Sequence, residues 1–172
     1  IFTHSSLQMV SFTITEKGYA LKGLSSAISL VCALLYKRYK ANQAPIALVS
    51  MDNCSHNGEK LQKAVLDTAK EWLEKSSVTE GFLSYLCNEN QVSFPWSMID
   101  KITPRPAQSV YEALKHSSVE NIEPIITSKK TYIAPFVNAE APQYLVIEDN
   151  FPNGRPPLEK AGVYLTDRDT VN

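Results

Sequence analysis

The stretch that decides the fold is IALVSMDNCSHNGEKLQKAVLDTAKEWL, residues 46–73. Its first six residues, Ile46 to Met51, form a short apolar run with two β-branched members, which is typical of a strand covered on both faces. The polar loop Asp52–Gly58 follows and contains no apolar residue larger than cysteine. Apolar residues then recur at intervals of three and four from Leu61 to Leu73, which predicts one buried helical face. The stretch therefore predicts a strand, a loop and a helix, with Asn57 as the helix N-cap.

The preceding segment repeats this order of strand and helix. Gln8–Thr15 alternates in polarity and has high β propensity, which predicts a strand. Thr15–Tyr19 predicts a loop at its end, and Ala27–Lys40 predicts a helix with a basic C-terminal turn. Strands and helices in alternation are the signature of parallel βαβ construction. Ligands of such sheets bind just past the carboxyl ends of the strands, where Asp52 and Asn53 follow the second strand.

Weaker patterns mark the later elements. Prolines at 104 and 106 end regular structure, and Asn150–Pro157 is rich in turn formers. Trp72 and Tyr85 fall at helical spacing and are predicted to lie in the core. The further predicted elements are helices at Thr79–Cys87 and Ala107–Lys115, and strands at Thr131–Phe136, Gln143–Glu148 and Gly162–Thr166.

Composition and charge bound the class of protein. The 172 residues, 44% hydrophobic and 20% charged, predict one soluble domain with an ample core. The net charge of −1 and pI near 6.4 give no electrostatic case for binding nucleic acid or an anionic membrane. No apolar run approaches the roughly 20 residues that span a bilayer. The sequence opens without methionine and stops without a natural terminating element, which predicts a piece of a longer protein.

The cysteines and glycines exclude several kinds of site. Three unclustered cysteines, at 32, 54 and 87, fit reduced thiols and predict a cytoplasmic protein. The six glycines are dispersed, so neither a dinucleotide fingerprint nor a phosphate-binding loop is present. Cys54 and His56 beside Asp52 are too weak a pattern for zinc, and we expect no metal site. Ser55, His56 and Asp52 are too close in sequence to form a hydrolytic triad.

Four stretches together carry a resemblance. They are SFTITEKGY (residues 11–19), VSMDNCSHNG (49–58), FPWSMIDKITP (94–104), and VIED with GRPPLEK (146–149 and 154–160). In this order the sequence resembles the long-chain mannitol dehydrogenase family, which includes mannitol 2-dehydrogenase and the fructuronate and tagaturonate reductases. The motifs are spread over most of the chain.

The resemblance implies an α/β fold of Rossmann type, a mostly parallel sheet with flanking helices. Residues 1–172 would form the later part of the NAD(P)-binding domain. The family's glycine-rich loop would lie before Ile1, and its catalytic lysine and helical C-terminal domain would lie after Asn172. The implied activity is hydride transfer between NAD or NADP and C2 of a polyol or sugar acid, in a protein that uses no catalytic metal and often works as a monomer. Because the lysine and the first βαβ unit are outside this sequence, the isolated chain is expected to be inactive.

The resemblance also implies roles for three residues in contact with substrate. Asn53 would donate a hydrogen bond to the reacting oxygen as negative charge develops; the alternative is that it caps the turn after the strand. Asp100 would contact the nicotinamide ribose or orient the substrate, unless it caps a local turn. Arg155 would pair with a substrate carboxylate, or it would lock its own loop through a surface salt bridge, which we favour.

The residues that bind the cofactor are also expected at the carboxyl ends of the strands. Glu16, Lys17, Asp52, Ile99 and Asp100 are the predicted cofactor-binding residues, and Lys17 could equally be a solvated residue at a strand end. One alternative function stays open, a non-catalytic fragment or a sugar- or nucleotide-sensing module, because fold does not fix function.

Overall fold

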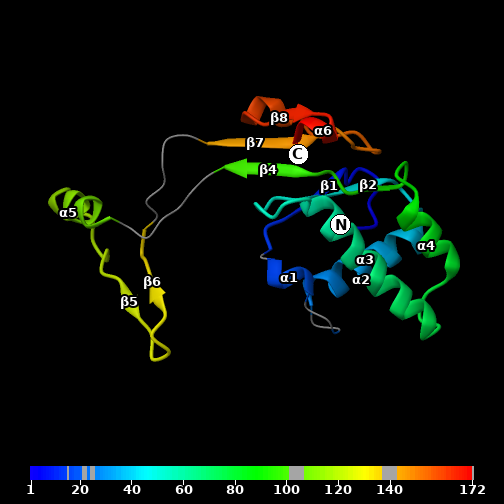
Figure 1. Ribbon diagram of the computed structural model, residues 1–172, viewed down its shortest axis with the longest axis horizontal. Helices are drawn as coiled ribbons and strands as arrows, with labels where there is room; N and C mark the ends of the chain where they lie inside the picture. Colours follow the sequence, from blue (N-terminus) through cyan, green and yellow to red (C-terminus); the bar gives the residue numbers. More distant parts are fainter. Residues whose placement is uncertain (15, 21–22, 24–25, 101–106, 137–142, 172) are drawn as a thin grey trace. The chain divides into compact units, whose positions relative to one another are not determined.

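A computed structural model describes residues 1–14, 16–20, 23, 26–100, 107–136 and 143–171 (Figure 1). Thr15, the predicted end of the first strand, and the prolines at 104 and 106 lie outside the described residues. The chain divides into two compact units, Ile1–Ile99 with Tyr144–Asn172, and Asp100–Gln143. The expectation of one domain over residues 1–172 stays a prediction.

The first unit is built on a parallel sheet of three strands. They are β1 (Met9–Phe12), β2 (Ile46–Ser50) and β3 (Val92–Ser93), in the order β1-β2-β3. β2 runs parallel to both neighbours, and all five of its residues are buried. An apolar run with both faces covered belongs at the centre of such a sheet. The predicted βαβ order and the parallel sheet are confirmed.

Helices cover this sheet on the side shown below β1 and β2 in Figure 1. They are α1 (Glu16–Ala20), α2 (Ala27–Ala41), α3 (Asn57–Glu74) and α4 (Glu80–Cys87). Leu35 of α2, Leu61 of α3 and Phe82 of α4 are fully buried in one core with Leu48 of β2. Burying such side chains stabilises the fold by roughly 1.5–3 kcal/mol each. The three- and four-residue spacing of the sequence therefore marks the faces that pack on the sheet.

A second sheet begins after a short segment in which the chain leaves the first sheet; this segment is called the break between β3 and β4. Its strands are β4 (Ser97–Asp100), β7 (Tyr144–Glu148) and β8 (Tyr164–Thr166), in the order β4-β7-β8, and β7 and β8 are parallel. Phe94–Trp96 separates β3, which pairs with β2, from β4, which pairs with β7. Pro95 has no N–H to donate at this point. A smaller core of Ala47, Val49 and Ile147 joins β2 to β7. Leu158–Ala161 forms a 3₁₀ helix, and α6 spans Arg168–Val171.

Arg38 is the largest fully buried side chain described. The sequence places it in a basic helix end, where a solvated charge is expected. Instead its guanidinium donates to five main-chain carbonyls, which belong to Phe2, His4, Leu7, Ala44 and Pro45. Burial lowers the pKa of Arg38, although an arginine stays charged at neutral pH. The residue ties the N-terminal segment to the turn before β2.

The second unit contains α5 (Gln108–His116) and an antiparallel pair, β5 (Ile125–Ile126) and β6 (Tyr132–Ile133). The predicted helix at Ala107–Lys115 is confirmed to within one residue. The predicted strand at Thr131–Phe136 shortens to the two residues of β6. Tyr111 of α5 donates a hydrogen bond to Glu123, which connects the helix to the segment before β5.

Two local predictions were wrong. Thr15–Tyr19 is not a loop throughout, because α1 begins at Glu16. Asn57 is not the N-cap of α3 but its first residue; His56 precedes it in the left-handed conformation and makes no side-chain cap. The N-cap prediction failed because of a tertiary contact: the Asn57 side-chain amide forms hydrogen bonds with β4 and does not cap its own helix. Among the helices that the structure describes, none is both long and apolar enough to cross a membrane.

Candidate functional site

A cleft of about 710 Å³ opens past the carboxyl ends of β1 and β2. Both the segment after β1 and the loop after β2 contribute to it, so the sequence correctly placed the Glu16 and Asn53 loops together. Its walls are formed by Thr13, Ile14, Glu16, Asp52, Asn53, Cys54, Ser55 and Lys60. Strand ends meet here because the strands are parallel, and ligands of open α/β sheets bind at such edges.

Asp52 holds the loop after β2 in shape. One carboxylate oxygen accepts a hydrogen bond from the Cys54 N–H at 2.9 Å. The other accepts from the Ser50 hydroxyl at 2.8 Å and from the Tyr19 hydroxyl. Burial, reinforced by the bond to Asp52, raises the pKa of Tyr19 above its ordinary value, so this hydroxyl stays protonated. Tyr19 was not predicted from the sequence; its neighbours along the chain give no sign that it meets a residue 33 positions away.

Asn53 lies exposed on the cleft wall. In the described part of the chain its side-chain amide makes no hydrogen bond. The turn after β2 is capped by its neighbour, since it is Asp52 that accepts from the Cys54 N–H. The turn-cap alternative for Asn53 therefore has no contact to support it, and its amide is available to a ligand.

Lys60 is a cleft residue that the sequence did not single out. It lies in the first turn of α3, and its Nζ is 3.5 Å from the carboxylate of Glu16. The two side chains are 37% and 78% exposed, and a pair as long and as solvated as this contributes little stability. Both charges can therefore reorient toward a ligand. Lys17 is exposed on α1 and is not among the cleft residues.

The predicted residues of β4 are not among the residues that line this cleft. Ile99 is half-buried within β4, and Asp100 is exposed at the end of the strand. Asp100 belongs to the second unit. The cofactor and substrate roles expected for these two residues stay predictions.

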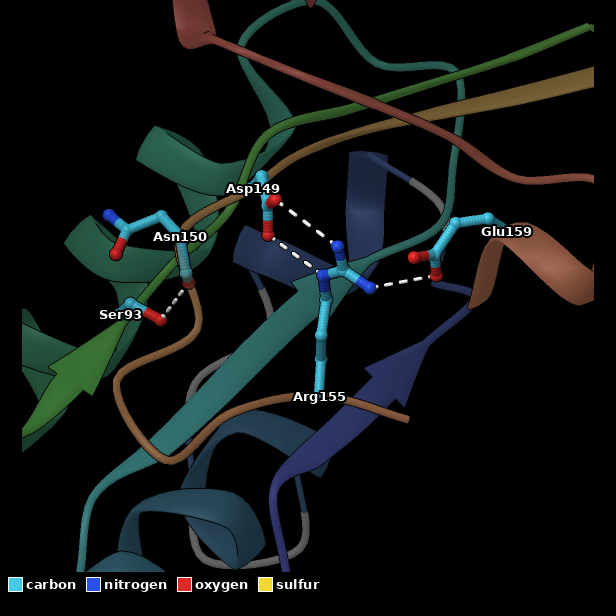
Figure 2. A network of polar contacts seen from close by, with 5 residues as sticks. All are labelled: Ser93, Asp149, Asn150, Arg155 and Glu159. Atoms are coloured by element: carbon cyan, nitrogen blue, oxygen red, sulfur yellow. Dashed lines mark hydrogen bonds and ion pairs between the residues drawn. The ribbon is translucent and has the colours of Figure 1, made fainter. Parts of the chain in front are cut away.

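Arg155 is paired within its own loop (Figure 2). Its guanidinium makes a fork with the Asp149 carboxylate, with Nε at 2.9 Å and Nη2 at 3.3 Å. Nη1 donates to Glu159 at 2.7 Å. These two carboxylates raise the pKa of Arg155. The contacts are those of the loop-locking alternative, and the substrate-binding role stays a prediction.

A further polar cluster surrounds Trp96 at the break between β3 and β4. The buried Glu148 accepts from the Trp96 N–H at 3.0 Å and from Nε of Arg168 at 3.0 Å. The Arg168 guanidinium lies 5.5 Å from the Trp96 ring centre, within cation–π range. His56 packs on the same ring at 4.6 Å between centroids. Within the described residues no three His, Cys, Asp or Glu side chains are arranged to hold a metal ion.

The three thiols are expected to react with iodoacetamide in a fixed order. Cys87 is exposed and should react first. Burial, with a smaller contribution from the Asp52 carboxylate, raises the pKa of Cys54, so at pH 7 its thiolate fraction and its rate are lower. Burial raises the pKa of Cys32 to about 12, and this thiol should not react in the folded protein. Reactivity follows the thiolate, so the Cys54 rate should keep rising as the pH is raised above about 8.5.

Mass spectrometry of labelled peptides at pH 7 and pH 9.5 measures the three rates. Protein unfolded in urea is the control, and there the three thiols should differ little. Labelling of Cys32 as fast as Cys87 in the folded protein would contradict the described core.

Comparison with known proteins agrees with this architecture. The family described as Mannitol dehydrogenase Rossmann domain matches residues 4–160. D-mannonate oxidoreductase of Thermotoga maritima is 48% identical over 192 residues, covering 99% of this chain and 35% of that protein. Polyol:NADP oxidoreductase of Gluconobacter oxydans is 29% identical over 191 residues, covering 94% of this chain and 34% of that protein.

A solved structure shows the same fold. Mannitol 2-dehydrogenase of Pseudomonas fluorescens, in a ternary complex with NAD and D-mannitol, superposes with a TM-score of 0.68 at 27% identity. The match covers 98% of this chain and 35% of that one, so the chain spans about a third of the length of these relatives. The family match over most of the chain, the parallel sheet and the cleft at its carboxyl edge all agree. The chain belongs to the mannitol dehydrogenase family, with the fold of its Rossmann domain.

Proposed function

We propose that the protein is an NAD(P)-dependent oxidoreductase that interconverts a polyol or sugar acid and its 2-keto form. The observation that carries this proposal is the cleft at the carboxyl ends of β1 and β2. The exposed side-chain amide of Asn53 lies on its wall and makes no hydrogen bond with any described residue. A carboxyl-edge cleft is where an α/β sheet of this kind binds a dinucleotide. The family match supports the same reading.

Asn53 is the catalytic residue of this chain in the proposal. Its Nδ2 donates a hydrogen bond to the substrate oxygen at C2, which carries negative charge as the carbonyl is reduced or the alcohol is oxidised. The nicotinamide, when bound, accepts or supplies the hydride. The general base, a lysine in the family, and the glycine-rich loop would come from parts of the protein outside this sequence.

The remaining residues have binding roles in the proposal. Glu16, Lys17, Ile99 and Asp100 are the proposed cofactor-binding residues, and of these four Glu16 lines the cleft. Asp52 acts through its hydrogen bonds, which keep the loop beside the cofactor in place. Asp100 also orients the substrate.

A sugar acid is the first substrate class to test. The 48% identical relative is named for D-mannonate, whereas the Gluconobacter oxydans and Pseudomonas fluorescens relatives named for a polyol and for mannitol are 29% and 27% identical. Arg155 is the cation that would meet the carboxylate, and binding there would require exchange of Asp149 or Glu159 for the ligand.

The location and the oligomeric state are also part of the proposal. Unpaired cysteines support a cytoplasmic location. The proposed protein works as a monomer.

A non-catalytic sensor or fragment is the alternative function, and it is not favoured because the relatives are named oxidoreductases. An assay of the full-length protein decides between them. Polyols, hexonates and their keto forms are offered with NAD(H) and with NADP(H), and absorbance at 340 nm is followed. We expect turnover with at least one hexonate or polyol. Cofactor binding by calorimetry without turnover on any substrate would favour the sensor.

A further inference from the structure

Two residues at the start of α3 lie in the break between β3 and β4. Asn57 and Gly58 are the first residues of this helix, and both are buried. Asn57 is only 1% exposed. A polar side chain so deeply buried must be satisfied by partners inside the protein.

The Asn57 side chain bonds to Ser97 as a neighbouring strand would. Its Oδ1 accepts from the Ser97 N–H at 3.0 Å, and its Nδ2 lies 3.1 Å from the Ser97 carbonyl oxygen. An acceptor and a donor facing the N–H and C=O of one residue reproduce the contacts of a strand ladder. The amide thus stands in for peptide groups that β2, which ends at Ser50, no longer provides.

The same amide reaches the loop that carries Asn53. Nδ2 lies 2.9 Å from the Asp52 carbonyl oxygen and 3.3 Å from that of Ser50. The Asp52 carbonyl belongs to the peptide bond that it forms with Asn53. Holding this oxygen fixes the orientation of that peptide plane, and with it the backbone from which the Asn53 side chain projects.

Gly58 allows the helix to come this close. A Cβ atom added at Gly58 would overlap the carbonyl oxygen of Phe94 and the ring of Trp96. Only a residue without a side chain leaves room for the start of α3 to enter the break. The position of Asn57 therefore depends on a glycine at position 58.

We propose that Asn57 is a positioning residue that aims the Asn53 amide into the cleft by holding the Asp52–Asn53 peptide against β4. This inference rests on the proposed function, because it assumes that Asn53 contacts the reacting oxygen. A donor of this kind works only within about 2.7–3.1 Å of the developing charge. A displacement of about 1 Å can cost on the order of 10²-fold in rate.

The first test compares Asn57→Ala with Tyr85→Phe in the full-length protein. The Tyr85 hydroxyl, on the buried side of α4, donates to the Ala44 carbonyl at 2.9 Å. Its loss removes a hydrogen bond at the opposite, amino end of β2, where no proposed site residue lies. At a temperature where circular dichroism shows all proteins folded, we expect kcat of Asn57→Ala to fall at least tenfold, with KM for the cofactor changed less than threefold. Tyr85→Phe should keep its kcat.

A double-mutant cycle separates positioning from general loss of stability. If Asn57 acts through Asn53, then Asn57→Ala should have little further effect on kcat in a protein that already carries Asn53→Ala. The same fold-loss in both backgrounds would overturn the inference. An equal loss of kcat in Tyr85→Phe would overturn it as well.

A readout independent of activity is provided by Cys54, one residue beyond Asn53. Its N–H bond to Asp52 holds it in the same loop. The Asn57→Ala change should raise the labelling rate of Cys54 by iodoacetamide at least tenfold, whereas Tyr85→Phe should leave it unchanged. An unchanged Cys54 rate in Asn57→Ala would overturn the inference even if the protein proves to be no dehydrogenase. If the wild type showed no turnover but Asn57→Ala still raised the labelling rate of Cys54, the proposed function would fail. The positioning of the loop by Asn57 would stand.

A milder variant serves if Asn57→Ala does not fold. Ser97→Ala removes only the hydroxyl, which contacts the Asn57 amide at 3.1 Å and donates to the Ser50 carbonyl. The main-chain bonds to Asn57 remain. We expect the same direction of change in kcat and in Cys54 labelling, about twofold to tenfold, and no change in either would contradict the inference.

Discussion

Replacing Asn53 by alanine is expected to lower kcat of the full-length protein by roughly tenfold to a thousandfold, the scale of losing one oxyanion donor. The side chain is exposed at the cleft and has no hydrogen bond in the described part of the chain. Its removal should therefore leave the fold intact. Steady-state kinetics at 340 nm, with thermal unfolding measured on the same samples, checks both parts of this expectation.

Asn90→Ala is the matched control for this substitution. Asn90 is also an exposed loop asparagine, but it precedes β3 and so lies toward the amino ends of the strands. The control should keep its turnover. If Asn53→Ala were as active as Asn90→Ala, Asn53 would have no part in the mechanism; if it lost turnover by unfolding, the exposed placement would be wrong.

Replacing Arg38 by methionine is expected to lower the free energy of unfolding by at least about 3 kcal/mol. Methionine keeps much of the buried volume but removes the guanidinium donors from five carbonyl oxygens. The oxygens of His4, Leu7 and Ala44 each keep one other donor, whereas those of Phe2 and Pro45 have no other in the described part of the chain. Leaving even one buried acceptor unsatisfied costs about 1–3 kcal/mol. Because whole domains are stable by only about 5–15 kcal/mol, the variant should unfold at clearly lower urea concentration.

Lys40→Met provides the comparison on the same helix. Lys40 lies in the last turn of α2 but is exposed, and such surface changes stay within about 0.5 kcal/mol. Urea denaturation followed by circular dichroism distinguishes the two variants. Equal midpoints for Arg38→Met and Lys40→Met would contradict the buried position of Arg38.

Much of the fold could be predicted from the sequence. Ile46–Val49 is apolar throughout, and this composition is typical of a strand covered on both faces. The spacing of Leu61 and Val65 marks a helix face in the same way, and both are fully buried. The alternation of such segments is enough to require a parallel sheet, and a parallel sheet is enough to bring the Glu16 and Asn53 loops to one edge.

The long-range polar contacts could not be predicted. The tie between Asn57 and Ser97 joins residues 40 positions apart, Tyr19 and Asp52 are 33 apart, and Arg38 reaches back to Phe2. Periodicity reports which face of an element is buried, but it carries no information about which polar groups meet once the elements are packed.

The sequence by itself thus determined the order of strands and helices, the parallel direction of the sheet and the edge at which the cleft opens. The tertiary structure alone decided that Asn57 lies in the break before β4, that Arg38 is buried, and that Asp52 rather than Asn53 caps the turn. The physical reason is that apolar burial follows a local repeat along the chain. Satisfying a buried hydrogen-bonding group depends on atoms that only the folded chain brings within about 3 Å.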